Sequence, residues 1–234
     1  MNISTDRKTV VFLGAKSEIA HELNVRMTAD GWTPEVWARR WPIPEFRFHK
    51  WDLCVVAIGQ VGPVGPWYEQ EEWDSAIESN VLLPVRLLRA IWHAHNPGAS
   101  ICFMAGANPN KPMSGYSAYS VGKMALLKAC EHLDMETPDA KFFALGPGTV
   151  LTKIHDATRK VKWKNPVLEA ADKAGEDRAA KIDRIYGCLK WCIEQPKEIV
   201  GGRNICASDP WNQPWYANWL RLIPSRNKLR RIER

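Results

Sequence analysis

Two side chains that could exchange a proton with a substrate stand one helical turn apart in the segment YSAYSVGK, residues 116–123. On a helix, Tyr119 and Lys123 would share a face because they are four positions apart. A phenol with a pKa of about 10 is a weak base near neutral pH, and a neighbouring ammonium favours the phenolate. The pair therefore indicates an acid/base site. The alternative is an ordinary buried helix that happens to contain both residues. Tyr116 has Ser120 in the corresponding position, so it lacks a lysine partner.

The elements that would position this pair alternate between buried strands and helices. Apolar runs that end near glycine predict strands at 9–15, 33–39, 52–59, 99–106 and 141–148. Apolar residues spaced three or four apart predict helices at 17–31, 71–95, 117–136 and 177–194. Pro84 lies inside the second of these helices and predicts a kink or local break there. Alternating strands and helices predict an α/β fold of the Rossmann type, a doubly wound parallel sheet with helices on both faces. The 234 residues fit a single domain, 1–234.

The turn LGAKSEIA, residues 13–20, stands between the first strand and the first helix, where a dinucleotide-binding turn would lie. Only Gly14 occupies one of the three usual glycine positions, and Glu18 and Ala20 hold the other two, so a plain strand-to-helix turn is the alternative. Arg39 and Arg40 end the second expected strand, where arginine accommodates an adenosine 2′-phosphate. With Lys16 in the glycine turn, these cations favour NADP over NAD. A solvated basic edge is the other interpretation.

With these pieces in order, the sequence resembles the short-chain dehydrogenase/reductase family from about residue 8 to about 155, and more loosely to 211. The resemblance rests on five segments in the family's order: GAKSEIA, VVAIG, EEWDSAIESNVLLP, YSVGK and LGPGTVLT. The family's Tyr-x-x-x-Lys motif falls on Tyr119 and Lys123, which implies that Tyr119 is the general acid or base. Asn80 matches the asparagine that anchors a water in the family's proton relay.

The resemblance also implies which residues bind the cofactor and hold the nicotinamide. The residues matched in this way are Gly14, Lys16, Ser17, Glu18, Ile19, Arg39, Arg40, Ala57, Gly59, Tyr119, Lys123, Pro147, Gly148, Val150 and Thr152. The family's activity would be hydride transfer between the nicotinamide and a substrate carbon, interconverting a secondary alcohol and a ketone.

Two departures from the family pattern bear on activity. The family's catalytic serine is replaced by Gly106, and losing one oxyanion donor costs on the order of 10²–10³ in rate. Asn108 or Asn110, on the substrate side, would donate a hydrogen bond to the substrate oxygen through its side-chain amide in place of the serine. The alternative is that both asparagines are turn residues. Between Arg40 and Gly59 the chain is too short for the usual helix, strand and helix. We therefore expect six main strands with the outer strand lost or reduced, and a shallow adenine pocket unless Trp41 supplies a wall.

Composition and charge set the remaining expectations. Hydrophobic residues make up 45% and charged residues 25%, as in soluble globular proteins, and no apolar run reaches the ~20 residues of a membrane span. The start of the chain reads as a strand rather than a signal peptide, so a cytoplasmic location is expected. Six scattered cysteines predict buried free thiols and no metal site. No nucleic-acid partner is expected, although the basic end of the chain, from 221 onward, leaves a contact with nucleic acid or acidic lipid open beside a solvated tail.

Two further regions are assigned by position. Residues 153–196 would form a substrate-side lid that begins basic, which suits either an anionic substrate such as a nucleotide-linked sugar or simple solvation. Residues 211–234 form an aromatic and basic tail. The family resemblance implies a homo-oligomer, a dimer or tetramer, and the expected helix 71–95 carries Trp73, Leu87, Leu88 and Trp92 for that contact.

Three hypotheses for function follow. The first is an NADP-dependent oxidoreductase acting on a small molecule with a hydroxyl or carbonyl group, which includes sugars. The alternative is a catalytically impaired relative that binds a nucleotide or acts as a sensor or scaffold subunit. The third is a peripheral membrane protein that uses its aromatic, basic tail.

Overall fold

The computed structural model describes residues 7–37, 49–106, 112–162, 165–175 and 177–229. In these residues six strands form one parallel sheet in the order β2-β1-β3-β4-β5-β6. The strands are β1 (Thr9–Leu13), β2 (Thr33–Trp37), β3 (Trp51–Val56), β4 (His95–Met104), β5 (Lys141–Gly146) and β6 (Asn204–Cys206). The expected doubly wound α/β fold with six main strands is confirmed. The outer strand was expected to be lost between Arg40 and Gly59; residues 41–48 of that stretch lie outside the described residues, and Trp51–Val56 form β3.

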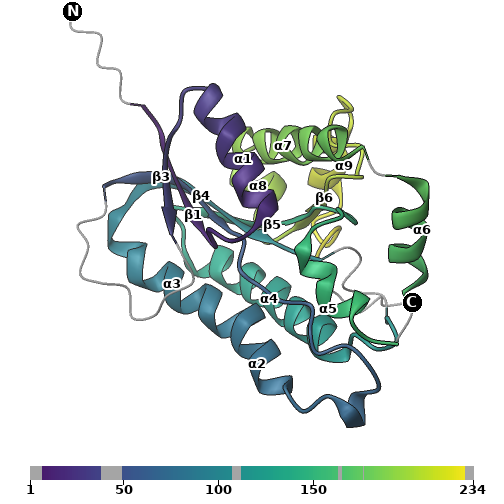
Figure 1. Cartoon of the computed structure of the whole chain (residues 1–234). Coiled ribbons are helices and arrows are strands. Elements are labelled where there is room, and N and C mark those ends of the chain that lie inside the picture. The colour runs from purple at the N-terminus through teal and green to yellow at the C-terminus, as the bar shows by residue number, and fades with distance from the viewer. Residues whose placement is uncertain (1–6, 38–48, 107–111, 163–164, 176, 230–234) are drawn as a thin grey trace, which may run out of the picture.

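Helices cover both faces of the sheet (Figure 1). One face carries α1 (Glu18–Ala29), α7 (Arg178–Glu194), α8 (Lys197–Val200) and α9 (Tyr216–Leu222). The other face carries α3 (Leu83–Ile91) and α4 (Ser117–Glu136), with α2 (Trp73–Ile77) below them. Short helices η1 (Trp67–Glu69), η3 (Trp92–Ala94), η4 (Lys153–His155), α5 (Asp156–Arg159) and α6 (Pro166–Ala174) lie in the connections.

The alternation of side chains along each strand builds the two cores. Val10 and Phe12 of β1 face the cluster under α1 and α7, whereas Val11 and Leu13 face the cluster under α3 and α4. All four side chains are at most 1% exposed. Because both faces of a parallel sheet are covered, its strands are continuous apolar runs. This is why the runs in the sequence located β1 to β5 to within a few residues, whereas the three-residue β6 was not among the predicted runs.

The strand order places the carboxyl ends of β1 and β3 side by side in the middle of the sheet. The chain leaves β1 toward β2 on one side and returns to β3 on the other, so the direction of winding reverses between β1 and β3. In doubly wound sheets the crevice at this reversal is where ligands bind. The turns after β1, β3, β4 and β5 all open toward it.

The segment 71–95 was expected to be one long helix with a kink or local break at Pro84. The break is present just before Pro84, and only the expected end of the helix at residue 95 is wrong. The segment contains α2, a π-helical turn (η2, Glu78–Leu82), α3 and η3, and its last residue, His95, already starts β4. In the π-helical turn the Leu83 N–H bonds to the Glu78 carbonyl, five residues back. A proline ring clashes with the carbonyl four residues before it in a regular α-helix, and the wider turn just before Pro84 accommodates that clash.

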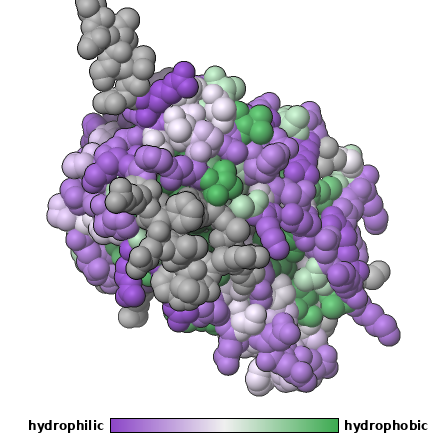
Figure 2. Space-filling view, turned by 60° about the vertical axis from the view of Figure 1, so that its left-hand side comes forward, coloured by the Kyte–Doolittle hydropathy of each residue, from purple (hydrophilic) through white to green (hydrophobic). Residues whose placement is uncertain are grey.

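Three of the four apolar side chains expected to pack against a second subunit are used within the chain itself: Leu87, Leu88 and Trp92. Leu87 and Leu88 are 2% and 4% exposed and belong to the core between α3 and the sheet. Trp92 stacks on His95 with ring centroids 4.1 Å apart. On the face shown in Figure 2, hydrophilic residues cover most of the described surface and hydrophobic ones form small separate patches. The homo-oligomer therefore stays a prediction from the family resemblance.

The basic segment near the end of the chain is not a free tail as far as residue 229. Arg203 is 2% exposed and donates hydrogen bonds to the carbonyls of Leu220, Ile223 and Arg226. The Asn204 N–H donates to the carbonyl of Asn227 at 2.8 Å. These bonds hold the backbone of the segment after α9 against β6, while the side chains of residues 221–226 are exposed to solvent.

Candidate active site

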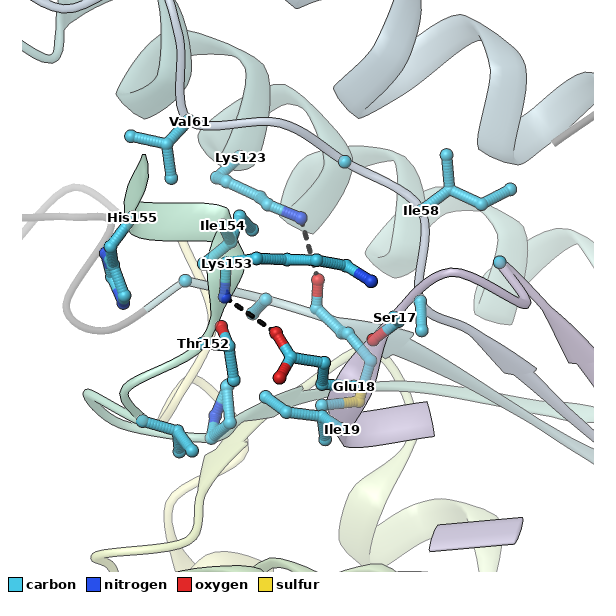
Figure 3. A pocket seen from close by; sticks show the side chains of 18 of the residues that line it. Ser17, Glu18, Ile19, Ile58, Val61, Lys123, Thr152, Lys153, Ile154 and His155 are labelled. Atoms are coloured by element: carbon cyan, nitrogen blue, oxygen red, sulfur yellow. Dashed lines mark hydrogen bonds between the residues drawn. The ribbon is translucent and has the colours of Figure 1, made fainter. Parts of the chain in front are cut away.

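A cavity of about 270 Å³ opens at the carboxyl ends of the central strands (Figure 3). Its walls come from the turn after β1, the ends of β3 and β4, one face of α4, and the segment that follows β5. The lining residues are Gly14, Lys16, Ser17, Glu18, Ile19, Ala57, Ile58, Gly59, Val61, Met104, Ala105, Gly106, Tyr119, Lys123, Pro147, Gly148, Val150, Thr152, Lys153, Ile154 and His155.

The turn after β1 requires glycine at its first position. Gly14 has a φ of +116°, and a Cβ there would lie 2.7 Å from the carbonyl oxygen of Ala57. The turn can pack directly on the end of β3 only because no side chain intervenes. Ser17 then caps α1, and its Oγ accepts a hydrogen bond from the Ala20 N–H at 3.2 Å. The expected strand-to-helix turn is therefore present, with its helix amino end at the cavity.

Tyr119 and Lys123 lie one turn apart on α4 and both face the cavity. The Lys123 ammonium is 6.0 Å from the centroid of the Tyr119 ring. Lys123 is 4% exposed, and its Nζ donates to the Met104 carbonyl oxygen at 2.9 Å. Burial lowers the pKa of Lys123 to about 8 and raises the pKa of Tyr119 to about 12. Tyr119 therefore keeps its phenol proton near neutral pH, and the neighbouring Lys123 is a cation that loses its charge as the pH rises through about 8.

Asn80 is fully buried behind Gly59 and does not line the cavity. Its Nδ2 donates to the carbonyls of Gln60 and Ala76, both at 2.9 Å, and its Oδ1 accepts from the Gln60 N–H at 3.3 Å. A Cβ on Gly59 would lie 2.7 Å from Asn80 Oδ1 and 3.1 Å from Lys123 Nζ. The π-helical turn thus points the Asn80 amide at the backbone after β3, where it fixes the turn beside the lysine.

Gly106 faces Tyr119 directly. A Cβ on Gly106 would lie 2.5 Å from Tyr119 Oη, closer than real Cβ contacts come. The tyrosine hydroxyl therefore occupies space that a serine at this position would need. With Tyr119 in this position, only glycine fits at residue 106. The replacement of the family's serine therefore removes a Cβ as well as a hydroxyl.

The second tyrosine of the segment, Tyr116, has a structural environment. It is 2% exposed, and its hydroxyl donates to Thr158 Oγ1 at 3.1 Å and accepts from Asn165 Nδ2 at 3.0 Å. These bonds connect α4 to the segment that follows β5. This placement agrees with the interpretation that Tyr116 is not the reactive tyrosine.

The structure brings together most of the residues matched by the family resemblance. All of them line the cavity except Asn80, Arg39, Arg40 and Asn108, and the last three lie outside the described residues together with Asn110. The sequence interpretation missed Ile58, Val61, Met104, Ala105, Lys153, Ile154 and His155. Met104 and Ala105 end a predicted strand and could have been found by that signal. Lys153, Ile154 and His155 reach the cavity because the chain turns back over it after Thr152.

Two expected absences can be examined only within the described residues. There, no three histidine, cysteine or acidic side chains are grouped in a way that would hold a metal ion. In the same ranges, no helix has both the length and the apolar character that crossing a bilayer requires. The six cysteines are all free, and all but Cys206 are buried, as expected.

Comparison with known proteins finds likeness in structure alone. No model of a known protein family matches the chain, and no curated protein matches it either. A short-chain dehydrogenase/reductase from Saccharomyces cerevisiae is 16% identical with a TM-score of 0.70, and the match covers 87% of this chain and 97% of that one. A small-chain dehydrogenase in complex with NADPH is 17% identical with a TM-score of 0.68, covering 86% and 96%. An actinorhodin polyketide ketoreductase with NADPH is 16% identical with a TM-score of 0.67, covering 87% and 96%. The resemblance found in the sequence is thus confirmed at the level of architecture, and the chain has the fold of the short-chain dehydrogenases and reductases.

Proposed function

We propose that the chain is an NAD(P)-dependent oxidoreductase that interconverts a secondary alcohol and a ketone. The observation that carries this proposal is the convergence of Tyr119 and Lys123 on one cavity at the reversal point of a doubly wound sheet. Two of the structurally similar dehydrogenases are complexes with NADPH, which supports a nicotinamide cofactor.

The residues at one end of the cavity fit the nicotinamide half of such a cofactor. Lys123 supplies an ammonium, and Gly148, with a φ of +74° and open space where a Cβ would be, leaves backbone accessible beside Pro147 and Thr152. Val150 offers an apolar wall for a ring, and Gly14 brings the amino end of α1 to the other end of the cavity. When bound, the cofactor supplies the hydride.

The chain's own residues would move the proton and hold the charge. In the reducing direction the Tyr119 Oη–H bond breaks and its proton joins the substrate oxygen as the ketone carbon accepts the hydride. The Lys123 ammonium then stabilises the phenolate that remains. Asn80 acts as a positioning residue, because its amide fixes the turn at Gly59 against which Lys123 lies.

NADP as the cofactor, a sugar-like substrate and a cytoplasmic location are finer parts of this proposal. The preference for NADP rests on Arg39 and Arg40 in the sequence and on Lys16, which lines the cavity. A polar or anionic substrate is supported by Lys153 and His155 on the wall formed by the segment after β5.

A nucleotide-binding relative without catalysis is the second candidate, and the Gly106 position favours it. No hydroxyl at residue 106 is available to polarise a substrate oxygen, and the space for one is taken by Tyr119. The two candidates share a cofactor site and differ only in turnover.

The first test is titration with NADPH and, separately, NADH, following energy transfer from the twelve tryptophans to the reduced nicotinamide. Saturable binding, stronger for NADPH, is expected. Binding of neither at millimolar concentration would overturn both candidates. Where binding is found, a screen of ketones and oxidised sugars separates the enzyme from the nucleotide-binding relative.

A further inference from the structure

The carboxylate of Glu18 lies inside the cavity and ties three segments together. Glu18 is the first residue of α1 and stands where the family resemblance places the second glycine of the dinucleotide turn. Its Oε2 accepts a hydrogen bond from the Lys153 N–H at 2.6 Å, which Figure 3 shows crossing the cavity. Its Oε1 accepts from Arg178 Nη1 at 3.1 Å. One carboxylate therefore joins the start of α1, the start of η4 and the start of α7.

This carboxylate stays ionised near neutral pH. The hydrogen bond from the Lys153 N–H is the largest effect and lowers the pKa of Glu18. Burial opposes it, and the hydrogen bond and charge of the Arg178 guanidinium lower the pKa further, so the net shift is downward. The amino end of α1 adds free backbone amides and the positive end of the helix dipole, which favour a negative charge. The chain has thus placed its own anion beside the amino end of α1, where the Lys153 amide and the Arg178 guanidinium meet.

The donors around Glu18 could make more hydrogen bonds and ion pairs than this one carboxylate uses. The Nε of Arg178 is buried and has no hydrogen-bond partner in the described residues. The side chains of Lys16 and Lys153 line the same cavity. A diphosphate carries two negative charges and several acceptor oxygens, so it can bond to the Lys153 amide and the Arg178 guanidinium that Glu18 now contacts.

A diphosphate bound beside the Glu18 carboxylate would be destabilised by repulsion between their negative charges. Two unit negative charges about 4 Å apart repel by about 1 kcal/mol in water and by several times more near a protein surface. Glycine, the usual residue of the dinucleotide turn, brings no such charge and lets the backbone approach the phosphates.

We propose that Glu18 is an internal anion that holds the diphosphate place of the cofactor and must move out before a dinucleotide binds. This inference rests on the proposed function. Displacing Glu18 breaks its bonds to Lys153 and Arg178, so cofactor binding also releases the segment that begins at η4 and covers the substrate side. Arg178 then contacts the phosphate oxygens in place of the carboxylate.

The test compares nucleotide affinity in matched charge variants of the full chain. Glu18→Gln keeps the shape of the side chain and removes its charge, and it should bind NADPH and NADH more tightly by at least about fivefold. Glu22→Gln is the control, because Glu22 lies one turn further along α1, pairs with Arg26 at 2.9 Å and does not line the cavity. Its affinity should equal that of the unchanged chain. Arg178→Gln should bind both nucleotides more weakly.

A second measurement needs no nucleotide. Hydrogen exchange of the Lys153 amide should be faster in Glu18→Ala than in the unchanged chain, because that amide loses its acceptor. Thermal melts of each variant show whether the fold is retained. Exchange that is equally slow in both proteins would mean that the bridge to Glu18 does not hold this segment.

The outcomes separate this inference from the proposed function. Equal affinity of Glu18→Gln and the unchanged chain, or weaker binding by the variant, would overturn the inference and leave the oxidoreductase standing. Absence of nucleotide binding in every variant would overturn the proposed function, and the inference with it.

Discussion

The hydroxyl of Tyr119 lies against the bare backbone of Gly106, so closely that a Cβ at residue 106 would come within 2.5 Å of it. Gly106 follows the end of β4 and Tyr119 lies in the first turn of α4. The strand end and the helix therefore meet without an intervening side chain at the one position where the family resemblance expects a serine. The tyrosine hydroxyl can lie where it does only because residue 106 has no side chain.

Replacing this glycine should harm the site. In Gly106→Ser the new Cβ displaces the Tyr119 hydroxyl, because both cannot occupy the same space, and overpacking of this kind costs about 1–3 kcal/mol. We expect lower thermal stability and lower turnover than in the unchanged chain. Gly106→Ala is the control for bulk without a hydroxyl. Higher turnover in the serine variant would show that Tyr119 moves aside readily and that the serine hydroxyl contributes to catalysis.

Removing the hydroxyl of Tyr119 tests its role as proton donor and acceptor. Tyr119→Phe should lower turnover by at least about a hundredfold, the range expected when a general acid or base is lost. Cofactor affinity, measured by energy transfer from tryptophan to nicotinamide, should stay nearly the same because the ring remains. Activity equal to that of the unchanged chain would remove Tyr119 from the mechanism.

The pKa of Lys123 predicts how stability depends on pH. Burial lowers this pKa from 10.5 to about 8, so between about pH 8 and 10.5 the unfolded chain binds more protons at this residue than the folded chain. Stability from this group therefore rises as pH increases through that window. Relative to Lys123→Met, the unchanged chain should gain up to about 3 kcal/mol in free energy of unfolding between pH 7.5 and 10.5.

Denaturant unfolding of the two proteins at both pH values measures this difference, and other titrating groups cancel in the comparison. Lys123→Met should also abolish turnover at all pH values. A stability difference that does not change with pH would mean that the ammonium is better solvated than its burial indicates.

Arg39 tests the preference for NADP. Arg39→Ala should weaken the binding of NADPH much more than the binding of NADH. Only NADPH carries the 2′-phosphate that an arginine at the end of the second strand would contact. Separate titrations with the two nucleotides give the ratio. An equal loss for both would show that this arginine does not distinguish them.

The strands and the glycine turn could be located from the sequence because local physics determines them. A parallel strand such as β1 is apolar at every position, since both of its faces are covered, and Gly14 marks its end. The spacing of Tyr119 and Lys123 likewise predicts a shared helical face with no knowledge of the fold. Pro84 predicts a kink or local break in the helix, because its ring clashes with the carbonyl four residues back. The hydrogen bonds of Asn80 to the backbone of Gln60, twenty residues away, could not be predicted from this local pattern.

The sequence by itself determined the alternation of strands and helices and the fold class, because both follow from residues close together in the chain. It also predicted the chemistry that we propose for Tyr119 and Lys123. The tertiary structure alone decided that Glu18 reaches Lys153 and Arg178, which are 135 and 160 residues away. It also decided that Tyr119 fills the space beside Gly106, and that Leu87 and Leu88 serve the chain's own core. These contacts join segments that the sheet brings together at its carboxyl edge, and no local pattern records which distant side chains will meet there.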